Sequence, residues 1–225
     1  PELAYDGATH EAGKTELMAR LRPRTGGELR AVGTVTARLG LGARDDLAQA
    51  PVAARLVAED VDLGFLPAAA PGVVREAQGK LQGEVRAEGP LSRPSPRGRL
   101  TVKDARLAMT EYGDWSGIGV DVEVNDDAVE LRKLEARRGK GTLQARGSVR
   151  GLAGRSATIE ASAALDRLTV ARAGMDLATF DMKLSATGSY TNGTAEVEVK
   201  LPGGTVTLPR KLPRSLRSLE QRPDI

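Results

Sequence analysis

The sequence predicts an all-β protein built as an elongated, curled, mostly antiparallel sheet with one apolar side. Apolar and polar residues alternate along most of the 225-residue chain. A period of two is typical of strands that have one apolar and one charged face. Aromatic residues make up only 3% of the chain, whereas large rings usually fill a compact core. An aliphatic face with few rings suits an open sheet better than a thick sandwich.

The N-terminal third of the chain predicts strands that lead into a short cap. Alternation over 16–21 follows a predicted hairpin turn near Gly13, and a long strand is expected over 28–41. A polar loop over 42–51 and an extended segment over 52–63 come next. Residues 63–78 are rich in Ala and interrupted by Pro67 and Pro71, so we expect a short helix or turn there.

The central region, 79–151, alternates with the fewest interruptions. We expect a Pro-rich link over 90–96 and turns at 125–127 and 139–141. Val129 and Leu131 share one phase of the alternation, but Leu134 and Ala136 have the other. This change of phase predicts a β-bulge near Lys133.

The C-terminal third predicts strands over 159–165 and 180–188, then a hairpin at Asn192-Gly193. Asn192-Gly193-Thr194 also matches a glycosylation acceptor, but we interpret it as the turn. Residues 209–225 are interpreted as a connector, with a short basic amphipathic helix as the alternative. We treat 1–225 as one fragment of a longer β domain.

Composition argues against several classes of function. The chain has no Cys and one His, so disulfides and thiolate metal sites are excluded, and we interpret His10 as a surface residue. Five basic residues and one acid fall within 208–222, which leaves the rest of the chain close to neutral. We therefore expect no nucleic-acid surface.

No motif indicates catalysis or a cofactor. Gly13-Lys14-Thr15 resembles part of a phosphate-binding loop, but position 8 is Ala instead of Gly and a strand pattern follows. The carboxylate pairs Asp60/Asp62 and Asp126/Asp127 lack the spacing of a calcium loop. We expect a protein that is not an enzyme and has no metal or cofactor.

The ends of the chain suggest a piece of a longer protein. The most apolar stretch, 63–74, is short and contains two prolines, so no transmembrane span is expected. The sequence opens on Pro1 and a polar stretch, without the pattern of a signal peptide.

A family resemblance adds to these observations. The runs GKLQGEVRAEGPL and GTLQARGSVRG share a loose Gly, Leu, apolar, Gly form, and a second pattern extends from Asp127 through Gly151. Over 52–225, including Leu208-Pro209 and the terminal Pro223-Asp224-Ile225, the chain resembles the TamB family of translocation and assembly module subunits. More broadly, the chain is similar to the AsmA-like family of bridge-like lipid-transfer proteins.

The resemblance implies a β-taco, a curled sheet with an apolar inner groove. It implies a periplasmic location in a parent protein anchored to the inner membrane, although the N-terminal anchor helix of the family is absent here. The implied partners are phospholipid acyl chains, the outer-membrane barrel protein TamA and unfolded outer-membrane proteins. The implied roles are phospholipid transport to the outer membrane and assistance in outer-membrane protein assembly.

The candidate groove residues are apolar members of the alternating strands, a surface rather than catalytic points. Burial of each acyl CH₂ is worth about 0.8 kcal/mol, so such a surface can hold lipid without a polar site. Alternatives are a closed sandwich core, a scaffold that captures a client strand, and a passive surface or adhesin repeat. The candidates are Leu81, Val85, Leu100, Val102, Ile118, Val120, Val122, Val124, Val129, Leu131, Leu143, Val149, Met182, Leu184, Val197 and Val199.

Overall fold

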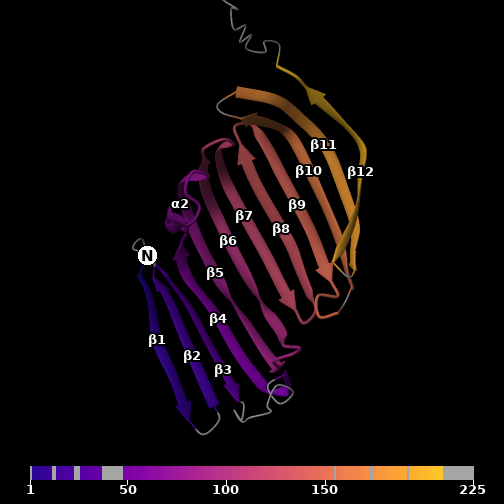
Figure 1. The fold of residues 1–225 in the computed structure, drawn as a ribbon. Coiled ribbons are helices and arrows are strands. Elements are labelled where there is room, and N and C mark those ends of the chain that lie inside the picture. The colour runs from indigo at the N-terminus through magenta and orange to yellow at the C-terminus, as the bar shows by residue number, and fades with distance from the viewer. Residues whose placement is uncertain are drawn as a thin grey trace, which may run out of the picture.

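The computed structural model describes residues 2–11, 14–22, 26–36, 48–154, 156–172, 175–191 and 193–209. They form one 12-stranded sheet whose strands follow sequence order. Every pair of neighbours is antiparallel, as in a continuous meander (Figure 1). The strands are β1 (Glu2–Glu11), β2 (Lys14–Arg22), β3 (Glu28–Thr36), β4 (Pro51–Asp62), β5 (Val74–Pro90), β6 (Ser95–Met109), β7 (Gly113–Asn125), β8 (Ala128–Arg138), β9 (Gly141–Arg150), β10 (Ser156–Arg172), β11 (Met175–Thr191) and β12 (Thr194–Thr207).

The sheet is open, curled and elongated, so the predicted fold class is confirmed (Figure 1). The strand order runs from β1 to β12 without returning to β1, and no second sheet is present among the described residues. The chain exposes 16199 Å². A compact protein of its mass, 23.7 kDa, would expose about 9,800 Å². The molecule therefore presents far more surface than a globular domain of equal size.

The predicted cap is present but shorter than expected. It consists of the 3₁₀-helix η1 (Leu63–Phe65) and the single-turn helix α2 (Leu66–Ala69). The prediction of helix or turn through residue 78 is wrong, because β5 begins at Val74. Gly79 is an interior residue of β5 with φ +128°. A glycine accepts this φ at little cost, so it does not mark the start of the strand.

Bulges cross the sheet near the end that carries α2. The register shifts in β4, β5, β6, β7 and β10 lie toward this end. Asp60, Asp104 and Arg167 have φ of 49°, 49° and 46° at three of them. The shift in β8 falls between Leu131 and Leu134, which confirms the predicted bulge near Lys133. Bulges bend strands and increase their twist, and here they curl this end of the sheet.

The small buried core lies at the same end. Among the described residues, Val61 at 1% exposure and Leu168 at 4% are the only buried side chains larger than alanine. Most of the other buried residues are alanines next to the bulges, such as Ala58, Ala77 and Ala105. Because alanine buries little area, this core is thin.

The connections mostly follow the sequence signals. Asp126 (φ 50°) and Gly139 (φ 58°) lie in the turns before β8 and β9. Thr191 pairs with Thr194 across the predicted Asn-Gly hairpin, as expected. The link predicted over 90–96 is shorter, since Pro90 still belongs to β5 and Ser95 already begins β6.

Other expectations fall on residues outside the described ranges. These are the turn near Gly13, the end of the strand expected over 28–41, most of the 42–51 loop and the connector beyond residue 209.

Candidate functional site

The sixteen candidate groove residues all lie on one side of the sheet, which we call the apolar face. Side chains of directly opposed residues share a face. Leu81 opposes Val102, and Val102 opposes Val120. The same relation links Leu100 to Val122 and Leu131, and links Leu143 through Leu165 to Met182. The bulge in β8 keeps Leu134 and Ala136 on this face, opposite Ala145 and Leu143.

The apolar face is not a closed core. None of the sixteen candidates is among the fully buried residues. Fourteen are half-buried, while Val197 and Val199 are 55% and 56% exposed. A second sheet would have covered them, so the described residues do not support the sandwich alternative.

Small residues hollow the apolar face between β2 and β5. A depression of about 460 Å³ lies there, and Val85 is the only candidate groove residue in its lining. The alternation over residues 28–41 predicts that Ala31 and Gly33 share one face of their strand. The hollow could not be predicted in the same way, because it also depends on which residues of the neighbouring strands are paired with them. Its lining on this face consists of Ala19, Ala31, Gly33, Ala54, Leu56, Val85 and Ala87.

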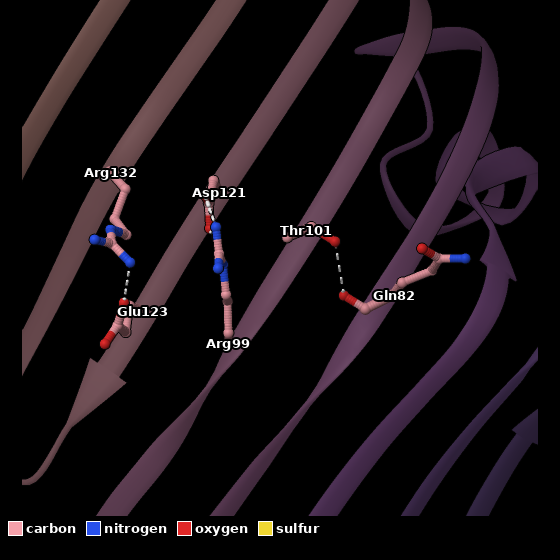
Figure 2. A network of polar contacts seen from close by, with 6 residues as sticks. All are labelled: Gln82, Arg99, Thr101, Asp121, Glu123 and Arg132. Atoms are coloured by element: carbon pink, nitrogen blue, oxygen red, sulfur yellow. Dashed lines mark hydrogen bonds and ion pairs between the residues drawn. The ribbon is translucent and has the colours of Figure 1, made fainter.

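The opposite side, the polar face, carries a ladder of ion pairs from β4 to β8. Arg55 Nε donates to Glu84 Oε1 at 2.8 Å, and Arg99 Nε donates to Asp121 Oδ1 at 2.7 Å. Arg132 Nη1 donates to Glu123 Oε2 at 2.7 Å (Figure 2).

Figure 2 also shows how these side chains sit on adjacent strands. The Thr101 hydroxyl donates to the Gln82 carbonyl at 3.4 Å, so a side chain supplements the pairing of β5 with β6. Each exposed ion pair of the ladder adds little to the stability of the fold, but the pairs together favour one register of the strands over its neighbours.

The ion pairs lower the pKa of their carboxyl groups. Hydrogen bonds from Arg55 and then Arg86 lower the pKa of Glu84 to about 2. The hydrogen bond from Arg99 lowers the pKa of Asp121, and Arg97 does the same to Asp126. These carboxylates stay charged at any physiological pH.

Three of the four carboxylates considered as calcium ligands make structural contacts instead. Asp62 Oδ1 accepts from the Gly64 N–H at 2.6 Å and caps η1, while Asp60 accepts from Gln82. Asp126 binds Arg97 through two bonds of 2.8 Å. Among the described residues, no group of three His, Asp or Glu side chains could hold a metal ion.

The described helices include none long and apolar enough to cross a membrane. Comparisons with protein-family models, with curated proteins and with solved structures found no match. The apolar face therefore has to be interpreted from its own geometry and from the residue pattern.

Proposed function

We propose that this chain is a segment of a TamB-like envelope protein that forms a hydrophobic path for phospholipids between the inner and outer membranes. One observation carries the proposal: a single open sheet presents a continuous aliphatic face that remains partly exposed. A contiguous apolar surface that stays in contact with solvent is typical of a site of interaction.

The chemistry of the face fits acyl chains. From β5 to β11 its paired positions away from the bulges are mostly Val, Leu, Ile, Met, Ala, Gly and Pro. The polar exceptions lie near the strand ends, with Tyr190 opposite Ala157 and Arg138 opposite Gly141. Each CH₂ removed from water contributes about 0.8 kcal/mol, so partial cover of one tail gives useful affinity. Because the middle of the strands offers no hydrogen-bonding side chain on this face, a tail has no fixed register there, which favours sliding along the face.

The wider setting belongs to the same proposal and comes from the resemblance. The parent protein would be anchored in the inner membrane and would span the periplasm. It would meet a TamA-like barrel at the outer membrane. Its role would be transfer of lipid rather than catalysis.

Lipid analysis of the purified chain tests the proposal. Val122→Asp with Leu143→Asp places two carboxylates on the apolar face, and Thr101→Asp with Ser148→Asp places two on the polar face. Native mass spectrometry should find phospholipid on the wild type and on the polar-face control, and much less on the apolar-face variant. Equal lipid content in all three proteins would contradict the proposal.

A second candidate function, a scaffold for client strands, is favoured by the edge strand β12. All fourteen of its residues are exposed, and Val197, Val199 and Leu201 are 55%, 56% and 59% exposed. An unprotected edge can accept another strand. The wild-type chain should capture an unfolded outer-membrane protein fragment, and the Val199→Lys variant should fail to do so. Equal capture by both proteins would show that β12 does not bind the client strand.

A further inference from the structure

The ladder of ion pairs on the polar face ends at β8. The β10 residues that oppose Arg146 of β9 and Lys183 of β11 are small or hydroxylated instead of acidic. Arg146 opposes Ser162, and Ser162 opposes Ser185. In the next row, Gln144 opposes Ala164, and Ala164 opposes Lys183.

These residues surround a hollow of about 490 Å³ on the polar face. Its cationic lining residues are Arg132, Lys133, Arg146 and Lys183, and Glu135 is its one acidic lining residue. Ser162 and Ala164 on β10 form a floor of short side chains between longer ones on β9 and β11. We call this hollow the basic trough.

Two of the four cations have no carboxylate partner among the described residues. Arg132 pairs with Glu123 at 2.7 Å, and Lys133 pairs with Glu135 at 2.9 Å. Arg146 makes one side-chain hydrogen bond, from Nε to Ser162 Oγ at 3.2 Å. Lys183 has no ion pair with any described residue, so its ammonium and most of the Arg146 guanidinium remain available to a ligand.

The spacing suits a compact oxyanion. Neighbouring strands lie about 4.8 Å apart and alternate residues along a strand about 7 Å apart. Arg146 and Ser185 are two strands apart, and Lys183 is one alternate position from Ser185. Their flexible side chains can therefore converge over the short floor.

We propose that the basic trough binds a phosphate group, either free or on a lipid headgroup. A guanidinium donates two parallel hydrogen bonds to phosphate oxygens, an ammonium adds a point charge, and the two serine hydroxyls donate to the remaining oxygens. The negative charge of the phosphate group, one unit on a phosphodiester headgroup and up to two on a free phosphate, complements the two unpaired cations. The trough lies on the face opposite the apolar face, so this site does not depend on the proposed lipid path.

Nuclear magnetic resonance titration of the 225-residue chain with inorganic phosphate tests the site. The test variants are Arg146→Gln and Lys183→Gln. Matched controls are Arg106→Gln and Lys103→Gln, exposed cations of β6 that have no ion pair with any described residue. We expect phosphate to shift the amide signals of 146, 162, 183 and 185, and each test variant to weaken binding up to about fivefold. The controls should bind as the wild type does.

Flotation with phosphatidylglycerol vesicles, against phosphatidylcholine vesicles, separates the two sources of phosphate. If the wild-type chain floats with phosphatidylglycerol vesicles and both test variants float less, the site binds a lipid headgroup. If the chain binds inorganic phosphate but does not float with the vesicles, the site binds a free phosphate group. The proposal is overturned if phosphate shifts no trough signal, or if test and control variants lose binding equally.

Discussion

An identical substitution at two valines of the apolar face distinguishes an open face from a covered one. Val61 follows the bulge at Asp60, opposes Leu81 and is 1% exposed. Val122 lies in the middle of β7 between Leu100 and Leu131 and is half-buried. Aspartate at position 61 would be an unpaired charge in the small core, whereas aspartate at position 122 would reach water.

The two changes should differ several-fold in cost. An uncompensated buried charge costs about 3–5 kcal/mol. Val122→Asp loses only part of the 1.5–3 kcal/mol that full burial of valine provides, or about 1 kcal/mol. For a chain of this length, 1 kcal/mol corresponds to about 2–4 °C in Tm. Thermal unfolding followed by circular dichroism should therefore show a fall of about 6–20 °C for Val61→Asp and about 2–4 °C for Val122→Asp.

An equal fall in Tm for the two variants would refute the reasoning. It would mean that Val122 is as well covered as Val61, and that the apolar face is an ordinary core. The comparison needs no lipid, so it tests the openness of the face separately from its function.

Two further predictions concern backbone strain and pH. A Cβ at Gly83 (φ +139°) would lie 2.0 Å from the Arg99 carbonyl oxygen, whereas one at Gly33 would have no atom within 4 Å. Gly83→Ala should therefore lower the free energy of unfolding by about 1–3 kcal/mol, and Gly33→Ala should raise it by about 0.4–1 kcal/mol. Similar urea midpoints for the two variants would contradict this prediction. Because the folded-state pKa of Glu84 is lowered to about 2 from an ordinary value of 4.5, its stabilising contribution is complete above about pH 4.5 and is lost as pH falls toward 2. Urea midpoints measured across this range should fall less steeply in Glu84→Gln, and a slope unchanged from the wild type would show that the Arg55–Glu84–Arg86 contacts do not form.

Alternation along single strands was enough to predict which residues share a face. The phase change between Leu131 and Leu134 even located the bulge in β8, because one extra residue reverses the side on which every later side chain lies. The boundary near residue 78 was predicted wrongly, since Gly79 looked like the start of a strand but sits inside a bulged one.

Features that depend on several strands could not be predicted. Charged residues alternate in β9 much as they do in β6, so nothing along either strand distinguishes Arg146 from Arg99. Only the register shows that Arg99 faces β7 with Asp121 in reach, while Arg146 faces Ser162. The hollow between β2 and β5 likewise requires small residues from adjacent strands to meet.

The absence of cysteine from the sequence allows the most direct test of the apolar face as a lipid-binding surface. Single cysteines at positions 120 through 124 of β7, each labelled with bimane, can be titrated with phospholipids that carry brominated acyl chains. We expect strong quenching at 120, 122 and 124 and weak quenching at 121 and 123, in the period of the strand. Quenching that is absent, or equal at all five positions, would contradict the claim that acyl chains lie against this face.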